Sequence, residues 1–191
     1  MSASSAPPLV LASTSPQRRA VLEQLGIPFD VVAPRYDEEP GGDPVEHARG
    51  KARSVAEEAG DRPVLGVDTA VMCEGKPYGK PGDATEAEAV LEALAGRTHE
   101  VVSGLCLLTP GWEVAEREVT HVTFRSLAAR DLAAYMSSGE WEGRAGAYAI
   151  QGRGAALVER IEGDYLNVVG LPAALLVRLL AERFPGLYGF G

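Results

Sequence analysis

Short apolar stretches that alternate with capped helices and hairpins constrain the fold of this chain more than any other feature. The first three stretches have the length and the β-branched content of buried strands, and helical segments separate them. Two longer runs follow, and they meet at Pro110 and Gly111 as the arms of an antiparallel hairpin do. Crossovers together with hairpins predict an α/β fold with a mixed sheet. The expected strands are residues 9–12, 29–32, 64–68, 99–108, 114–124 and 155–161.

Helix boundaries follow from capping residues. Ser15 followed by Pro16 begins one helix, which Gly26 ends. Asp43 and Thr85 each open a capping box, so we expect them to begin the next two helices. The expected helices are residues 16–25, 43–59, 85–96, 127–136 and 172–184, with a small hairpin over residues 70–78 that turns at Glu74 and Gly75.

Composition excludes several classes of partner. The 191 residues are 46% hydrophobic and carry a formal net charge of −9, so the chain can bury a core but repels nucleic acid and acidic membranes. No apolar run is long enough for a membrane span or a secretory leader, which predicts a cytoplasmic protein. We expect residues 1–8 to be a flexible tail and residues 9–191 to be a single domain. Cys73 and Cys106 stand outside any metal-binding pattern, and the three histidines have no ligand-like spacing.

The stretch "LASTSPQRRAVL" at residues 11–22 predicts an anion site. A helix N-terminus offers unpaired N–H groups and a partial positive charge, and arginines in the first turn strengthen its hold on phosphate. On a helical wheel Arg18 falls on the inward face, whereas Arg19 fits a surface position equally well. Ser13 and Ser15 can donate to the same oxygens, although Ser15 is the better candidate for the helix cap.

Asp68 ends the strand expected at residues 64–68, where open α/β sheets place ligand-binding groups. Such a carboxylate can bind Mg²⁺ or accept a proton from water, or it can simply cap a turn. Glu38, in the acidic loop "PRYDEEPGGD", can complete a cation site or stay solvated. Lys51 and Lys80 are candidate phosphate contacts, though a lysine within a helix is usually solvated. The run "AGAYAIQG" at residues 145–152 has small residues that let a planar ligand approach, and the amide of Gln151 can read a base edge.

Five motifs in this order resemble the Maf family of nucleoside triphosphate pyrophosphatases. They are the Ser-x-Ser-Pro-x-Arg opening at residues 13–18, Asp68-Thr69, Gly79-Lys80-Pro81, Gly96-Arg97-Thr98-His99 and the late "AGAYAIQG". The resemblance implies a Maf/Ham1 (inosine triphosphatase)-like fold with a mixed central sheet and two lobes with a cleft between them. It also implies hydrolysis of a nucleoside triphosphate to the monophosphate and pyrophosphate, with Mg²⁺ or Mn²⁺, in a homodimer. "AGAYAIQG" resembles the branch that acts on dTTP and UTP.

The resemblance also implies a role for each matched residue. Asp68 resembles the family's proton acceptor, and Arg18, Lys51 and Lys80 resemble its phosphate-contacting cations. Thr69 and Gln151 resemble its specificity positions. Glu38 and Asp68 are then the expected metal ligands, although a carboxylate bound to metal is a poor base, so the two roles of Asp68 compete. Gln17 stands where the family commonly has its first arginine, and Arg19 could compensate.

Three alternatives remain open from the sequence. The first is the 7-methyl-GTP branch of the same family, or a broader enzyme for damaged nucleotides. The second is a non-catalytic nucleotide-binding regulator of cell division, against which an intact Asp68 argues. The third is a plain phosphatase that releases orthophosphate, which the absence of Asp-x-Asp and Cys-x5-Arg patterns disfavours.

Overall fold

The computed structural model describes residues 6–190. The chain divides into two compact units. Unit 1 contains the described residues up to Asp68, Ser103–Glu118 and the described residues from Gly170 onward. Unit 2 contains Thr69–Val102 and Val119–Val169. The tail expected at residues 1–8 falls largely outside the described residues, and the single domain over residues 9–191 stays a prediction.

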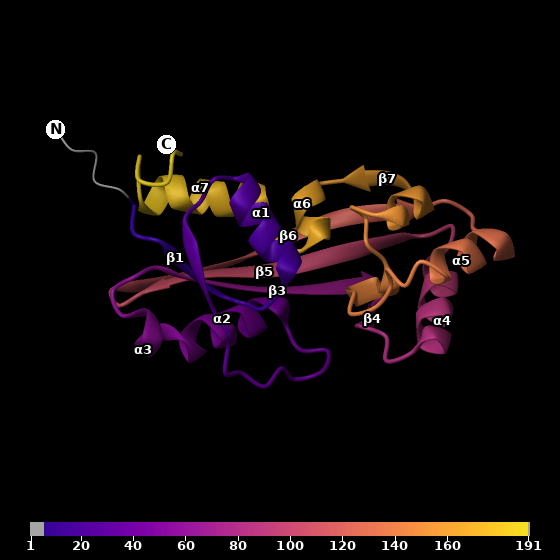
Figure 1. Ribbon diagram of the computed structural model, residues 1–191, viewed down its shortest axis with the longest axis horizontal. Helices are drawn as coiled ribbons and strands as arrows, with labels where there is room; N and C mark the ends of the chain where they lie inside the picture. The colour runs from indigo at the N-terminus through magenta and orange to yellow at the C-terminus, as the bar shows by residue number, and fades with distance from the viewer. Residues whose placement is uncertain (1–5, 191) are drawn as a thin grey trace. The chain divides into compact units, whose positions relative to one another are not determined.

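A mixed β-sheet runs through the chain, as the alternation of strands and helices predicts (Figure 1). Its order is β2-β1-β3-β5-β6-β7, with β4 paired to β3. β1 pairs in parallel with β2 and β3, whereas β4 and β7 pair antiparallel with β3 and β6. The strands are β1 (Leu9–Ala12), β2 (Phe29–Val32), β3 (Val64–Cys73), β4 (Lys76–Tyr78), β5 (Thr98–Thr109), β6 (Trp112–Phe124) and β7 (Val158–Glu162).

Helices cover both faces of the sheet within unit 1 (Figure 1). α2 (Pro44–Ser54) and α3 (Ala56–Ala59) lie on one face, and α1 (Pro16–Gln24) and α7 (Ala173–Arg183) lie on the other. β1 and the first half of β3 are buried on both faces, which explains their continuous apolar composition. The core under α2 and α3 consists of Val10, Ala12, Ala48, Ala52, Val55, Ala59, Val64 and Cys106.

Two glycines bring α2 unusually close to the sheet. A Cβ added at Gly66 on β3 would lie 2.1 Å from the carbonyl oxygen of Ala48, and one at Gly104 on β5 would lie 2.2 Å from that of Pro44. Only glycine fits at such an approach of helix backbone to strand. This close packing fixes the distance between α2 and β3, and it thereby positions Lys51, which lies on α2, relative to β3.

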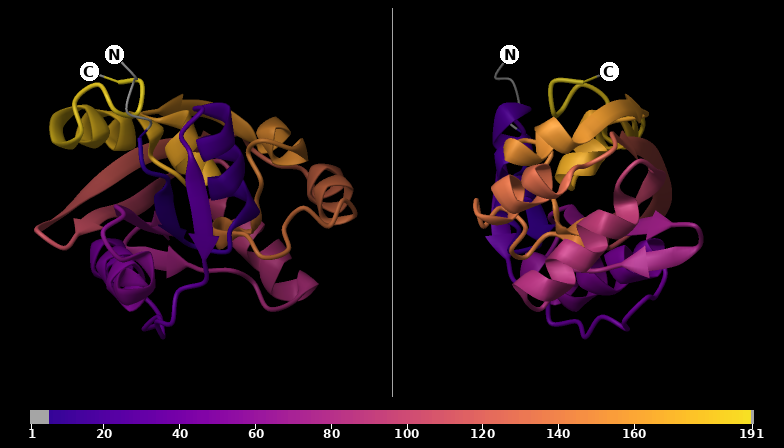
Figure 2. Two further views of the ribbon diagram at one scale, coloured as in Figure 1. Left: turned by 60° about the vertical axis from the view of Figure 1, so that its left-hand side comes forward. Right: turned by 90° about the vertical axis from the view of Figure 1, so that its right-hand side faces the viewer.

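The end of unit 1 returns to its beginning. After α7, the hydroxyl of Tyr188 donates a hydrogen bond to the carbonyl oxygen of Pro7 (2.7 Å). Figure 2 shows the segment after α7 on the same side of unit 1 as the start of β1. This contact holds both described ends of the chain against one another.

Unit 2 has its own aromatic core. The rings of His99, Phe124 and Tyr148 meet edge to face, with centroids 4.9 to 5.5 Å apart. A backbone hydrogen bond from Gly146 N to Gly79 O (3.2 Å) joins two of the sequence motifs. The helices of this unit are α4 (Ala84–Leu94), α5 (Ala129–Met136) and α6 (Tyr165–Val169), with 3-10 turns at Ala145–Ala147 and Arg153–Leu157.

Four expected elements differ in the structure. The helix expected at residues 43–59 is interrupted at Val55, whose ψ of 3° leaves the helical region. Asp83, two residues before Thr85, caps α4, because its Oδ1 accepts a hydrogen bond from the backbone N–H of Glu86 (2.8 Å). The strand expected at residues 155–161 begins only at Val158, after a 3-10 turn. α6 is an additional helix that the sequence does not predict, because its five residues are too few to show a helical period.

The fourth difference concerns Asp68 itself. The strand expected to end there continues to Cys73, so Asp68 lies within β3 rather than at its carboxyl end. Pairing with β4 across the turn at Glu74 and Gly75 extends the strand, and both turn residues have the positive φ of a tight hairpin. The carboxylate therefore projects from the face of a strand, toward whatever helix covers it.

Candidate active site

The first turn of α1 holds Arg18 in place. Ser15 caps the helix, since its hydroxyl accepts from the backbone N–H of Arg18 (3.5 Å), as the sequence predicts. The Arg18 guanidinium donates to the carbonyl oxygen of Gly170 from Nε (2.9 Å) and to the Ser13 hydroxyl from Nη1 (3.1 Å). Ser13 is 4% exposed. Arg18 is thus a positioned cation at a helix N-terminus, whereas Arg19 lies exposed on the next position.

A lysine and two carboxylates form the centre of unit 1. Lys51 Nζ lies 2.6 Å from Asp68 Oδ1 and 2.7 Å from Glu38 Oε1. Lys51 is 5% exposed and Asp68 is 9% exposed, while Glu38 comes from the exposed loop before α2. The sequence predicts Lys51 to be solvated if it has no function, so its burial against two carboxylates favours a functional cation.

His47 is a further neighbour of Asp68, and the spacing of the histidines in the sequence predicts no role for it. Its Nδ1 lies 3.3 Å from Asp68 Oδ2, so lysine and histidine take different oxygens of the carboxylate. The sequence does contain a signal for His47, because it stands four residues before Lys51 and residues four apart share a helix face. Once Lys51 is placed at the site, His47 follows one turn earlier.

The neighbouring cations set the ionisation of Asp68. Burial alone would raise the pKa of the carboxyl, but the charge and hydrogen bond of Lys51, together with Arg18 and His47, outweigh it and lower the pKa. Burial also lowers the pKa of the Arg18 guanidinium, against the raising effect of Asp68 and Glu38. Asp68 is therefore an anion at neutral pH, as a metal ligand or a proton acceptor must be.

The donor set of this cluster fits a divalent cation. Glu38, His47 and Asp68 each offer one ligand atom, and these atoms lie within 4.8 Å of one another. Two of the three donors are carboxylates, which suit both Mg²⁺ and Mn²⁺. Among the described residues, this cluster is the group of three acidic or histidine side chains close enough to hold an ion.

The remaining predicted site residues belong to unit 2. Thr69 follows Asp68 on β3, Lys80 stands exposed after β4, and Gln151 stands exposed after the buried run 146–150. Within this unit the backbone hydrogen bond from Gly146 to Gly79 brings the Gly-Lys-Pro and "AGAYAIQG" stretches together. The roles of Thr69, Lys80 and Gln151 stay predictions.

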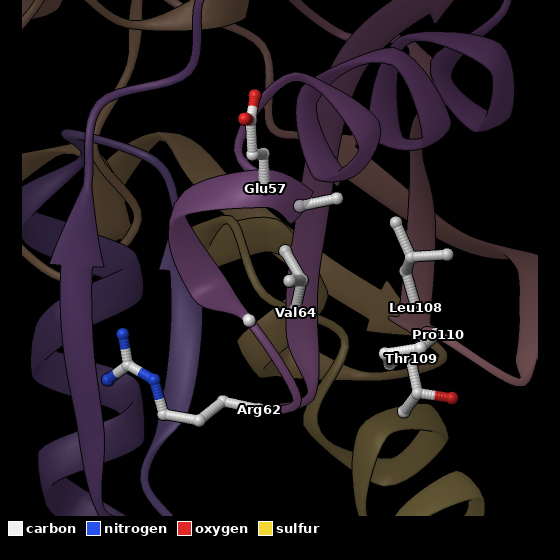
Figure 3. Close-up of a pocket in the computed structure, with 8 residues that line it drawn as sticks. Glu57, Arg62, Val64, Leu108, Thr109 and Pro110 are labelled. Carbon is white, nitrogen blue, oxygen red and sulfur yellow. The ribbon is translucent and has the colours of Figure 1, made fainter.

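An apolar hollow of about 360 Å³ also lies in unit 1 (Figure 3). Val64 and Leu108 line it from β3 and β5, and α3 contributes Glu57. The guanidinium of Arg62 at its rim forms an ion pair with Asp30 (2.5 Å). The hollow shares no residue with the Asp68 cluster and has little that could hold a triphosphate.

Comparison with known proteins identifies the family. The family described as "Maf-like protein" matches residues 8–183, which is nearly the whole chain. The chain belongs to the Maf-like family. The mixed sheet and the family expected from the five motifs are thereby confirmed.

Three curated relatives of this Maf-like chain carry the same name. A "dTTP/UTP pyrophosphatase" of Deinococcus radiodurans is 43% identical over 196 residues, covering 100% of both chains. Proteins of the same name from Nitratidesulfovibrio vulgaris and Moorella thermoacetica are 46% and 48% identical over 185 and 181 residues. These alignments cover 92% and 91% of this chain and 88% and 93% of the relatives. No helix of the described residues is long and apolar enough to cross a membrane.

Proposed function

We propose that this Maf-like protein hydrolyses dTTP and UTP to the nucleoside monophosphate and pyrophosphate, as a house-cleaning enzyme of the nucleotide pool. One observation carries the proposal: a buried, ionised Asp68 is held by Lys51 within a chain whose full-length relatives are named dTTP/UTP pyrophosphatase. A buried pair of this kind is a costly way to stabilise a fold, because desolvation offsets most of its attraction. Its presence favours chemistry over structure.

The cations of unit 1 would hold the phosphates. Arg18 is already oriented by Ser13 and Gly170, so it loses little freedom when it binds an anion. Lys51 can exchange a carboxylate for a phosphate oxygen as a point charge. The N–H groups at the start of α1 add a partial positive charge, and Ser15 and Arg19 are further proposed contacts there. Such a local cluster can bind a polyanion despite the net charge of −9.

Glu38 and Asp68 are the proposed holders of a divalent cation, Mg²⁺ or Mn²⁺. When bound, such an ion neutralises phosphate charge and polarises the phosphoryl group for attack. Asp68 is also the proposed acceptor of the proton from the attacking water. Its lowered pKa makes it a weak base in the free protein, but phosphates that draw on Lys51 and Arg18 would weaken the attraction that lowers this pKa.

Base selection is proposed to come from unit 2. The side-chain amide of Gln151 offers two donors and one acceptor, which suit the edge of a pyrimidine ring. Gly146 has a φ of 70° and its backbone packs against Val71, so a residue with a side chain would be strained at this position. Thr69 and Lys80 are the other proposed contacts in this unit. The resemblance to the dTTP and UTP branch supports these assignments.

A substrate panel tests the proposal. The purified protein is incubated with Mg²⁺ or Mn²⁺ and with dTTP, UTP, CTP, ATP, GTP or 7-methyl-GTP, and pyrophosphate is separated from orthophosphate. We expect pyrophosphate from dTTP and UTP, loss of turnover in Asp68→Asn, and normal turnover in Asp61→Asn, which changes an exposed aspartate. Turnover of 7-methyl-GTP alone would contradict the role of Gln151. Binding without any turnover would favour a nucleotide-binding regulator instead.

Assembly and location complete the proposal. We propose a cytoplasmic homodimer with no nucleic-acid or membrane partner, on the resemblance and on the net charge of −9. Sedimentation equilibrium of the purified chain tests the dimer. A single species of the chain mass, 20.1 kDa, across the concentration range would contradict it.

A further inference from the structure

His47 occupies a position where helix periodicity calls for an apolar side chain. The buried face of α2 consists of Pro44, His47, Ala48, Lys51 and Ala52. The imidazole is 8% exposed and loses most of its hydration there. A leucine would fill the same position at no such cost, so the imidazole needs an explanation.

The surroundings aim the ring at Asp68. Tyr36 packs edge-on against it, with centroids 5.9 Å apart. Gly42 leaves space beside Nε2 of the ring, because a Cβ at this glycine would lie 2.4 Å from that atom. Nδ1 is the nitrogen that faces Asp68 Oδ2 at 3.3 Å. Tyr36 and Gly42 therefore pack against an imidazole whose Nδ1 faces Asp68.

The 3.3 Å separation is one that two ligands of a single ion adopt. With metal–ligand distances of about 2.1 Å, neighbouring ligands lie about 3.0 Å apart in an octahedron and about 3.4 Å apart in a tetrahedron. Glu38 offers a third ligand atom, and the three ligand atoms lie within 4.8 Å of one another. His47 Nδ1 and Asp68 Oδ2 can therefore share one ion at their present separation, and Glu38 lies near enough to supply a third ligand from its exposed loop.

The contacts of Asp68 leave one of its oxygens for this ion. Asp68 and Glu38 carry two negative charges, and Lys51 Nζ lies within 2.7 Å of both carboxylates. Lys51 contacts Asp68 through Oδ1, so the Oδ2 side that faces His47 is separate from the lysine. A dication there can be bound through the Nδ1 lone pair of the imidazole.

We propose that His47 is a nitrogen ligand of the divalent cation at Glu38 and Asp68, and that it makes this site prefer Mn²⁺ to Mg²⁺. Imidazole is a good ligand for transition-metal dications, whereas Mg²⁺ favours sites made of oxygen and keeps its waters. The inference deepens the proposed function, because it concerns the cation of the same site. A hydrogen bond that merely orients Asp68 is the competing role for His47.

The variant His47→Asn separates the two roles. An asparagine amide can replace the Nδ1–H group as a donor to Asp68, but its nitrogen does not ligate a metal. His121→Asn is the matched control, because His121 is half exposed and lies near Glu100 in unit 2. Circular dichroism and thermal unfolding verify that both variants fold.

Two measurements use Mn²⁺ alone as the probe. Electron spin echo spectroscopy detects ¹⁴N coupling from a nitrogen bound directly to Mn²⁺, and Mg²⁺ competition gives the ratio of the two affinities. We expect imidazole ¹⁴N coupling in the wild type and in His121→Asn, and its loss in His47→Asn. The preference for Mn²⁺ over Mg²⁺ should fall at least about tenfold in His47→Asn, as the loss of a nitrogen ligand implies.

Bound Mn²⁺ without ¹⁴N coupling, or an unchanged ratio of affinities in His47→Asn, would overturn the proposal and leave His47 as a hydrogen-bond donor. Failure of the wild type to bind Mn²⁺ would overturn it as well. Pyrophosphate release from dTTP is assayed on the same preparations. Release without ¹⁴N coupling refutes only the ligand role, and coupling without release refutes only the proposed function.

Discussion

Replacing Lys51 by methionine tests whether the buried ion pair is the centre of the site. Methionine matches the length of the side chain but leaves Asp68 without the ammonium 2.6 Å away. Removing one member of a buried pair typically destabilises a protein by about 3 to 5 kcal/mol, because the other charge stays buried. Glu38 is half exposed and adds little to this figure. Loss of a cation that contacts phosphate should also lower pyrophosphate release by about 100-fold.

The loss of unfolding free energy caused by Lys51→Met should become smaller as the pH falls. In the wild type the pKa of Asp68 is lowered, so its ion pair stabilises the protein above about pH 4, the unfolded value, and this contribution is lost as pH falls through the folded pKa. In Lys51→Met the lysine no longer opposes the effect of burial, so the pKa of Asp68 should be higher than in the wild type. The difference in unfolding free energy between wild type and variant should therefore be largest at pH 7 and should narrow toward pH 4.

Urea unfolding of the wild type, Lys51→Met and Lys76→Met at pH 7 and pH 4.5 measures these differences. Lys76 is the control, because it is exposed and only lies over the ring of Tyr78. A loss below about 1 kcal/mol for Lys51→Met at pH 7 would refute the reasoning, since an unpaired buried carboxylate cannot be so well tolerated. An equal loss at both pH values would refute the assignment of the penalty to Asp68.

Three further predictions concern other parts of the chain. Burial lowers the pKa of His99 to about 4, so the histidine of the unfolded chain is protonated first as the pH falls, and this favours unfolding. In urea unfolding, the free energy of unfolding of the wild type should therefore fall by about 2 kcal/mol more than that of His99→Gln between pH 7.5 and pH 5. Gly66→Ala should destabilise the protein by about 1 to 3 kcal/mol, because its Cβ would press on the Ala48 carbonyl, whereas Gly111→Ala, with nothing within 4 Å, should be nearly neutral in thermal unfolding. Arg18→Lys should raise KM for dTTP about tenfold in steady-state kinetics, because lysine cannot keep both anchoring hydrogen bonds while it contacts phosphate.

Much of the fold could be predicted because its strands are short and continuous in apolar residues. β1 and β2 match their expected bounds, and Ser15 and Pro16 begin α1 as expected. The differences arise where a partner distant in sequence decides the outcome. β3 passes beyond Asp68 because β4 pairs with it. α2 ends at Ser54, although the sequence pattern continues.

The candidate site divides in the same way. Asp68 and Arg18 stand in motifs that can be read from the sequence. Lys51 is only a candidate phosphate contact there, and unit 1 places it against Asp68. His47 escapes such reading, because a lone histidine on a helix is ordinary until the strand beneath it is known. Gly170 escapes it too, since its carbonyl meets Arg18 from 152 residues away. Contacts between residues so far apart in the sequence depend on tertiary packing, which local sequence patterns do not predict.

The most direct test of the account is the position of water attack on dTTP. The reaction is run in H₂¹⁸O with the wild type and with Asp68→Asn, and mass spectrometry locates the label in the products. Attack at the α-phosphorus predicts ¹⁸O in dTMP, unlabelled pyrophosphate and almost no product from Asp68→Asn. Label in pyrophosphate or in orthophosphate, or unchanged turnover in Asp68→Asn, would contradict the central claim.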